Sequence, residues 1–329
     1  MNEIEELANI FCKAGGEFKN VRLDYCEESG FYCHVLDSEQ EALVFCPSNM
    51  LVDCDDIDVN SAGLFIKSPN QYMDNIEFLE KYFSFHFNKK LIDFFSSKKR
   101  FIDSLSSKDK SLISNILPVH LYELDGISEL EYAKNQIFNS HSVNYFGKNM
   151  IMPFVTFLNH DKRGVPYNIN KEGISVSGKF DGEVFAYYND YDTMMFAGGY
   201  GFVTDTGTAY SIPVMFQLPN GKQLAINRRP KNSVETQHGY SRPLVHKGAK
   251  SINVSYLPLF CESDKMLPMK IIKLVAFEIG ISPNMLFDMV KNLNIKALKP
   301  VATQLGESKN QYFEMMASAA KKQLEYIDN

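Results

Sequence analysis

The chain has 329 residues, 45% of them hydrophobic, and a formal net charge of −6 at pH 7. This length and composition are typical of an ordinary globular protein with one large or two modest domains. No apolar run reaches the roughly 18 to 20 residues that span a bilayer, and the N-terminus is acidic where a signal peptide is basic, which predicts a cytoplasmic protein.

Charge is distributed unevenly. Residues 1–60 contain fourteen acidic residues against three basic ones, so the remainder is net positive. Duplex nucleic acid is not an expected partner, because phosphate binding requires a concentrated basic surface. The one basic stretch, residues 222–250, is interpreted as a solvated loop, with an acidic partner or an RNA as the alternative. Its basic residues include Arg228, Arg229, Lys231, Arg242, Lys247 and Lys250.

The six cysteines include no Cys-x-x-Cys pair, and five of them lie within the first 54 residues. This pattern predicts reduced, mostly buried thiols. A zinc site built from Cys26, Cys33, His34 and Cys46 would have irregular ligand spacing, so no metal is expected.

The N-terminal part alternates a helix with short strands. Residues 3–14 have the pattern of a short amphipathic helix, which Gly15-Gly16 should end. Three strands are then expected, separated by turn residues and ended by Pro47. They cover residues 21–25, 31–36 and 42–46.

Residues 61–148 are predicted to be mainly helical. From 74 to about 105, apolar residues recur at helical spacing and phenylalanine is dense, which indicates a helical core; lining a substrate groove is the alternative role for these aromatic residues. Ser128 and Glu131 form a capping box that should open a helix running through Phe138.

Two fragments between 151 and 203 stand out as ligand-binding candidates. Residues 151–158 form an apolar run of strand length that ends on Asn159-His160, an ending that suits the edge of a ligand site. Residues 173–180 alternate in polarity, Asp181-Gly182 is a hairpin signal, and residues 183–188 are predicted to return as a strand.

Tyr200 lies within Gly198-Gly199-Tyr200-Gly201. Glycine lacks the Cβ that blocks close approach, so neighbouring backbone is expected to come near this tyrosine. The segment lacks the third glycine and the following helix of a nucleotide-binding loop, and a Rossmann-type enzyme is therefore disfavoured.

The C-terminal part begins with a second hairpin and ends in helices. Residues 212–218 and 222–226 flank Pro219-Asn220-Gly221, a strong turn signal. From Met266 onward the pattern is helical, with Ser282-Pro283 as one helix start and a capping box over residues 308–311 as another.

Taken together, these motifs resemble the group of SET-domain protein methyltransferases that includes the Rubisco large-subunit lysine methyltransferase. The resemblance covers roughly residues 5–215 and rests on Pro153, Asn159-His160, residues 182–188 and Tyr200-Gly201-Phe202. It implies an α+β protein: a β-rich SET fold with an inserted helical subdomain and a short C-terminal helical region. The corresponding segments would be 1–60, 61–148, 149–256 and 257–329.

The resemblance also implies a chemistry and its residues. The cofactor would be S-adenosyl-L-methionine, bound by Asn159, His160 and backbone near Gly30. Tyr200 would be catalytic, and Tyr188 and Phe202 would contact the substrate, a lysine of another protein. Lysine is favoured because Tyr188 and Tyr200 would form an aromatic channel, and because the acidic N-terminal block would attract a basic segment.

Three positions depart from the group's pattern. Gly30-Phe31-Tyr32 lacks the second glycine of a Gly-x-Gly cofactor segment, His141 stands where the group has arginine, and Thr193 stands where it has asparagine. These departures leave open the alternative of a SET-fold binding module that has lost catalysis. A histidine methyltransferase is a further alternative, because the wider group that the sequence resembles includes both lysine and histidine methyltransferases.

Overall fold

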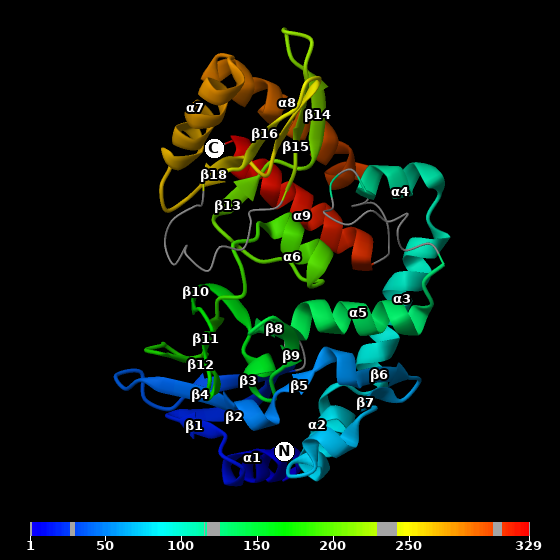
Figure 1. Ribbon diagram of the computed structural model, residues 1–329, viewed down its shortest axis with the longest axis vertical. Helices are drawn as coiled ribbons and strands as arrows, with labels where there is room; N and C mark the ends of the chain where they lie inside the picture. The colour runs from blue at the N-terminus through cyan, green and yellow to red at the C-terminus, as the bar shows by residue number, and fades with distance from the viewer. Residues whose placement is uncertain are drawn as a thin grey trace. The chain divides into compact units, whose positions relative to one another are not determined.

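The computed structural model describes residues 2–26, 30–114, 116, 126–228, 242–304 and 311–328. The chain divides into two compact units (Figure 1). Unit 1 comprises Met1–Phe101 with Gly126–Tyr188, and unit 2 comprises Ile102–Asp125 with Asn189–Asn329. Helices and mostly antiparallel strands are mixed in both, which confirms the α+β class.

A four-stranded sheet with the order β1-β4-β12-β11 forms the first layer of unit 1. Its strand β4 alternates buried and half-buried residues, because alternate side chains point to opposite faces of a sheet. The helix and the three strands predicted for this region are confirmed. The elements are α1 (Asn2–Lys13), β1 (Glu17–Lys19), β2 (Val21–Cys26), β3 (Gly30–Val35), β4 (Ala42–Pro47), β10 (His160–Val165), β11 (Asn168–Asn170) and β12 (Gly173–Gly178).

Helices and short strands complete unit 1. The predicted helical pattern from residue 74 is confirmed, and the Ser128 side chain accepts a hydrogen bond from the Glu131 N–H as an N-cap should. The elements are η1 (Ser48–Met50), β5 (Val52–Asp53), η2 (Cys54–Asp56), β6 (Ile57–Asn60), β7 (Gly63–Ile66), η3 (Pro69–Tyr72), α2 (Ile76–His86), α3 (Lys89–Ser104), α5 (Glu129–His141), β8 (Ser142–Tyr145) and β9 (Lys148–Ile151).

The apolar run 151–158 is not a strand, contrary to its length and composition. Only Ile151 belongs to β9, and the run then folds into a single 3₁₀ turn, η5 (Val155–Phe157). Phe154 has a φ of +63°, and its N–H donates to the Tyr82 hydroxyl at 3.1 Å. Nearly every residue of the run is buried, so its apolar pattern carries no periodicity that could distinguish a strand from a turn.

The hairpin predicted at Asp181-Gly182 is also wrong. Strand β12 pairs with β4 and β11, and residues 183–188 do not pair with it. The turn into β12 lies earlier, where the Asn170 side chain accepts from the N–H groups of Glu172 and Gly173. A Cβ on Gly173 would lie 2.1 Å from the Cys46 carbonyl oxygen, so this close strand approach requires glycine.

Unit 2 combines two small sheets with three long helices. The hairpin predicted at Pro219-Asn220-Gly221 is confirmed, and Gly221 has a φ of +78°. The predicted capping box at 308–311 lies outside the described residues except for Gln311. The elements are α4 (Ser107–Ser114), α6 (Thr193–Gly199), β13 (Thr208–Tyr210), β14 (Val214–Gln217), β15 (Gln223–Ile226), β16 (Val245–Lys247), β17 (Ser251–Val254), β18 (Pro258–Cys261), α7 (Leu267–Ile279), α8 (Pro283–Gln304) and α9 (Gln311–Asp328).

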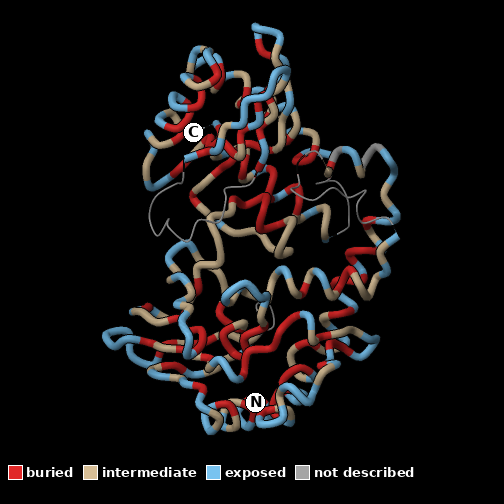
Figure 2. The backbone as a smooth tube through the Cα atoms, viewed as in Figure 1, coloured by how far each residue is buried: buried red, intermediate tan, exposed pale blue. Residues whose placement is uncertain are grey.

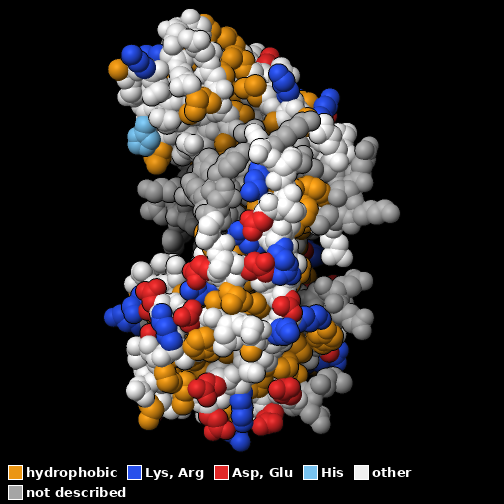
Figure 3. Space-filling view, turned by 90° about the vertical axis from the view of Figure 1, so that its right-hand side faces the viewer, with side chains coloured by type: hydrophobic (Ala, Val, Ile, Leu, Met, Phe, Trp, Pro, Cys, Tyr) orange, Lys and Arg blue, Asp and Glu red, His pale blue; other side chains and the backbone are white. Residues whose placement is uncertain are grey.

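Buried residues gather between the strands and helices of each unit (Figure 2). Four of the five cysteines whose side chains are described are buried free thiols, which confirms the expectation for them; Cys12 is exposed. Within the described ranges, every helix is too short or too polar to traverse a bilayer. Acidic and basic side chains are intermixed on the face of unit 1 that Figure 3 shows.

Candidate functional site

Asn159, His160 and Tyr188 meet in one hydrogen-bonded cluster of unit 1. The Tyr188 hydroxyl donates to the Leu158 carbonyl at 2.5 Å, and the Tyr188 N–H donates to His160 Nδ1 at 3.2 Å. The Asn159 carbonyl accepts from the Ala186 N–H at 2.9 Å. Hydrogen bonds from Ala186 and Tyr188 therefore hold residues 183–188 beside Asn159-His160. The order of the motifs in the sequence could not show this contact.

The Asn159 side chain has an acidic partner that the sequence prediction missed. Asn159 Nδ2 donates to Glu183 Oε1 at 2.6 Å. Burial raises the pKa of Glu183, while the hydrogen bond from Asn159 opposes that shift. An acidic residue directly after Asp181-Gly182, at the start of a predicted strand, is the sequence signal that could have indicated it.

His160 is a neutral imidazole at physiological pH. Burial lowers its pKa to about 4, against the opposing charge of Asp161. Because its Nδ1 accepts the Tyr188 N–H, the proton of the neutral ring is assigned to Nε2. The centroids of the His160 imidazole and the Tyr188 phenol ring lie 5.3 Å apart, and the Tyr167 ring stacks on Tyr188 with centroids 6.3 Å apart.

Gly30 begins β3 and pairs with Cys26 in the β2–β3 ladder. Further along β3, the Cys33 carbonyl accepts from the Val184 N–H at 2.8 Å, and the Phe31 ring lies 5.4 Å from Phe157. The strand therefore borders both segments of the Asn159 cluster. Among the described residues, no hydrogen bond joins Gly30 itself to Asn159 or His160.

Tyr200 and Phe202 belong to unit 2, where they follow helix α6. Tyr200 lies in a cluster of four rings, with centroids 5.4 Å from Phe196, 6.1 Å from Phe202 and 6.3 Å from Tyr191. Burial, and secondarily Tyr191, raise the pKa of the Tyr200 hydroxyl well above its usual value. The hydroxyl is therefore protonated at neutral pH.

Gly199 and Gly201 do not serve close backbone approach, contrary to the sequence prediction. A Cβ built on Gly199 or Gly201 would meet nothing within 4 Å. Gly201 instead turns the chain out of the helix, with a φ of +83° and its N–H donating to the Phe196 carbonyl at 3.0 Å. This left-handed conformation at a helix end is the physical reason for glycine at this position.

Helix α6, which Tyr200 caps at its C-terminal end, begins at a fully buried ion pair. Asp192 and Arg228 are 0% and 2% exposed, and Arg228 Nη2 lies 2.6 and 2.7 Å from the two Asp192 oxygens. The Asp192 carboxylate also accepts from the Met195 and Tyr210 N–H groups and from Gln323 Nε2. Arg228 Nη1 donates to the Ile116 carbonyl.

This network corrects the interpretation of residues 222–250 as a solvated loop. Arg228 is one of the most buried side chains of unit 2, because Asp192 supplies its counter-charge. Arg242 is exposed and pairs with Glu278, whereas Arg229 and Lys231 lie outside the described residues. Gln323 could have been suspected, since it interrupts the apolar face of α9 formed by Ala319, Ala320 and Ile327.

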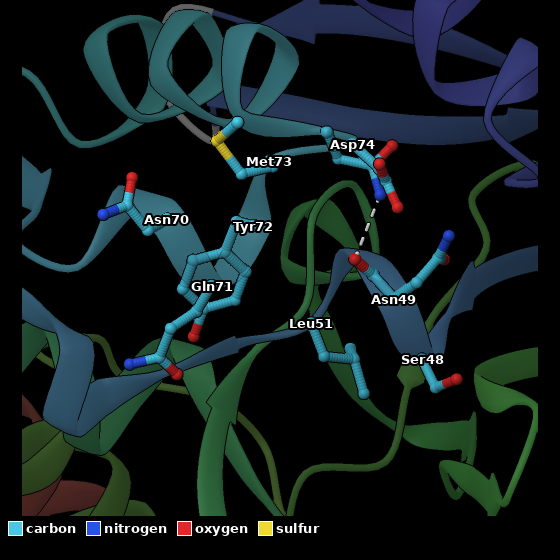
Figure 4. A pocket seen from close by; sticks show the side chains of 9 residues that line it. Ser48, Asn49, Leu51, Asn70, Gln71, Tyr72, Met73 and Asp74 are labelled. Carbon is cyan, nitrogen blue, oxygen red and sulfur yellow. Dashed lines mark hydrogen bonds between the residues drawn. The ribbon is translucent and has the colours of Figure 1, made fainter.

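One pocket of unit 1 lies apart from these residues. In the described part of the chain, no group of three or more His, Cys, Asp or Glu side chains could hold a metal ion. A pocket of about 380 Å³ in unit 1 is lined by mostly polar side chains, and Figure 4 shows Asn49, Asn70 and Gln71 around it. Its lining includes none of the predicted site residues.

The Asn159 cluster fits the cationic part of S-adenosylmethionine, the cofactor that the sequence resemblance implies. The ammonium and sulfonium groups of that molecule need negative or neutral surroundings. Glu183 supplies a carboxylate, His160 adds no positive charge, and Arg163 is neutralised by Asp161 at 2.8 Å. These side chains therefore offer a negative or neutral environment that suits such a cation.

Comparisons with known proteins give only a structural likeness. No protein-family model matches the chain, and no curated protein sequence matches it. Its structure is similar to a crystal structure of the SET domain of LSMT bound to lysine and AdoHcy, with a TM-score of 0.44 and 10% sequence identity over 99% of this chain and 89% of that one. It is similar to a structure of Rubisco LSMT bound to AdoMet with the same TM-score and identity, over 99% of this chain and 90% of that one.

Proposed function

We propose that this protein is an S-adenosylmethionine-dependent methyltransferase that methylates a lysine side chain of a protein substrate. The observation that carries the proposal is the meeting of Asn159, His160 and Tyr188 through hydrogen bonds. The order of motifs in the sequence indicates the same three residues independently of these contacts. Tyr200-Gly201-Phe202 completes the same motif order in the sequence.

Methyl transfer to an amine makes specific demands on the protein. The bound cofactor would supply a methyl group on a sulfonium, and the nitrogen lone pair of the substrate would attack that methyl carbon in line while the carbon–sulfur bond breaks and a neutral thioether leaves. The protein's task is mainly to position the two reactants, because little acid-base chemistry is needed at carbon. A free lysine must first lose a proton, which costs about 4.6 kcal/mol at pH 7 for a pKa near 10.4.

Each predicted residue has a role under these demands. Asn159 and His160, with backbone near Gly30, hold the cofactor, and the neutral state of His160 avoids repulsion of a cation. Tyr188 and Phe202 are assigned to contact with the lysine side chain, and an apolar environment would disfavour its ammonium form. Tyr200 acts as a neutral phenol whose hydroxyl orients the incoming nitrogen.

A binding module without catalysis is the second candidate, and His141 favours it. This residue stands where the resemblance has an arginine, but burial lowers its pKa to about 4, so it carries no positive charge at pH 7. It packs 5.4 Å from His86 and bonds to the Ser140 hydroxyl at 2.7 Å. The carboxylate of a bound amino-acid moiety would therefore find no cation at this position.

Transfer of a labelled methyl group separates these candidates. The full chain is incubated with labelled S-adenosylmethionine and a protein extract, beside Tyr200→Phe and Tyr191→Phe, which remove neighbouring hydroxyls of one ring cluster. Tyr200→Phe should lose most transfer while keeping cofactor affinity within a few-fold, and Tyr191→Phe should keep most of both. Full activity of Tyr200→Phe would refute the catalytic assignment, and the absence of cofactor binding by the parent protein would favour the binding module.

The pH dependence of the same assay addresses the target atom. With lysine as the target, turnover should continue to rise above pH 8 unless the channel lowers the amine pKa. Histidine, with a pKa near 6.5, is mostly neutral at pH 7, so its methylation should level off there. The raised pKa of Tyr200 keeps ionisation of that hydroxyl out of this range.

A further inference from the structure

Glu183 is fixed in place by backbone on both sides. The Val35 N–H donates to the Gly182 carbonyl at 2.7 Å, and the Val184 N–H donates to the Cys33 carbonyl at 2.8 Å. The residue thereby bridges to His34 of β3, while its side chain reaches Asn159 at 2.6 Å. Its carboxylate is therefore presented by a rigid frame that joins two of the segments predicted to bind the cofactor.

The charge of this carboxylate is only partly compensated within the described residues. Glu183 is half-buried and forms no ion pair with any of them. Burial and the like charge of Asp161 raise its pKa overall, whereas the hydrogen bond from Asn159 and the electrostatic influence of His34, opposite it on β3, lower it. The nearby Arg163 is engaged by Asp161 through two hydrogen bonds, at 2.8 and 2.9 Å, and His160 is neutral. A partly desolvated carboxylate without a counter-charge costs free energy that a bound cation would recover.

The Asn159 amide has its orientation set by the same carboxylate. An ionised carboxylate only accepts hydrogen bonds, so the amide group facing it must be the NH₂. The amide oxygen of Asn159 then points away from Glu183. An ammonium has three donors and no acceptor, and it can be satisfied by acceptors of this kind, one charged and one neutral.

We propose that Glu183 is the anionic anchor for a primary ammonium, namely the α-ammonium of the cofactor's amino-acid moiety, with Asn159 as the neutral acceptor beside it. This assignment rests on the proposed function. Because the same chemistry would also hold the ammonium of a substrate lysine, the test must separate the two sources.

Calorimetric titration with three ligands distinguishes the ammonium of the cofactor from the ammonium of a substrate lysine. S-adenosylhomocysteine keeps the ammonium but lacks the sulfonium, 5′-methylthioadenosine lacks the amino-acid moiety, and lysine is the substrate group alone. Glu183→Gln should bind S-adenosylhomocysteine about 10- to 100-fold more weakly than the parent protein, as expected for loss of a hydrogen bond to a charged group. Its affinity for 5′-methylthioadenosine should stay within about two-fold.

Controls keep the result interpretable. Glu172→Gln removes an exposed carboxylate of the same unit and should bind all ligands like the parent protein. Glu183→Asp keeps the charge and should fall between the parent and Glu183→Gln, and it replaces that variant if Glu183→Gln melts at a much lower temperature.

Three outcomes would overturn the assignment. Unchanged affinity of Glu183→Gln for S-adenosylhomocysteine would exclude an ammonium contact, and an equal loss for 5′-methylthioadenosine would show that Glu183 only orients Asn159. If Glu183→Gln bound only lysine more weakly than the parent protein does, Glu183 would be assigned to the substrate ammonium and not to the cofactor. If the parent protein bound neither nucleoside ligand, the proposed function itself would fail, which is distinguishable from failure of Glu183 alone.

Discussion

Replacing Arg228 by methionine tests the buried network that holds the start of helix α6. The substitution leaves the Asp192 carboxylate with Gln323 and two backbone N–H donors, but without the counter-charge that lies 2.6 Å away. Removing one partner of a buried ion pair typically costs about 3–5 kcal/mol, because the remaining charge is stranded in a poorly solvated site. A typical domain has about 5–15 kcal/mol in total, so much of the stability would be lost.

Arg242→Met is the matched control from the same predicted basic stretch. Its side chain is 65% exposed and pairs with Glu278, so water and salt already screen the interaction and the expected cost is about 0–1 kcal/mol. Urea unfolding of both variants, followed by far-UV circular dichroism, gives the two free energies of unfolding. Costs that agree within about 1 kcal/mol would refute the view that the Arg228 pair is desolvated and that it stabilises unit 2.

Three further predictions concern single residues. Asn159→Ala should remain folded but lose cofactor affinity in calorimetry, and unchanged affinity would remove Asn159 from the site. Gly201→Ala should lower the free energy of unfolding by about 1–2 kcal/mol, because its φ of +83° disfavours a Cβ, whereas Gly199→Ala, with open space and helical backbone, should be neutral or slightly stabilising. For Asp53, burial raises the pKa but hydrogen bonds from Lys148 and the Asp55 N–H lower it overall. Its contribution to stability is therefore present above about pH 4 and lost as pH falls through the lowered value, and Lys148→Met should flatten that acid limb in melting experiments.

Local signals predicted the elements that depend on local physics. The Ser128 cap is formed by residues three apart in sequence, and the turn at Pro219-Asn220-Gly221 is set by glycine and asparagine conformations. Strand β4 could be predicted because buried and half-buried residues alternate along it, which gives its sequence the period of two that is typical of a strand. The division into segments at 60, 148 and 256 stays a prediction.

Other features depend on partners far away in the sequence, and no local pattern encodes them. The chain bends at Asp181-Gly182, but residues 183–188 hydrogen-bond to β3 and Asn159 and not to β12. Arg228 is buried only because Asp192, 36 residues earlier, neutralises it, and Gln323 lies 131 residues from Asp192. Charge in the sequence shows which residues need partners, but it does not show where the partners are.

For the candidate site too, the sequence indicates residues but not their contacts with distant segments. Motif order selected Asn159, His160 and Tyr188, and the hydrogen bonds between their segments are consistent with that selection. Glu183 is not evident from the sequence, because its proposed role depends on the 2.6 Å contact to Asn159, 24 residues earlier, and on forming no ion pair with the other described residues. The glycines beside Tyr200 predicted close backbone approach, but a glycine just after a helix is an equally common pattern. The left-handed φ of Gly201 shows that the helix end is the reason for glycine at this position.

The most direct test of the proposed function is mass spectrometry of proteins methylated by the full chain. After incubation with isotopically labelled S-adenosylmethionine and a protein extract, labelled methyl groups should be found on lysine Nε atoms, and they should be absent when Tyr200→Phe replaces the parent protein. A protein that binds the cofactor but transfers no methyl group would contradict catalysis, and label found only on imidazole nitrogen would contradict lysine as the target.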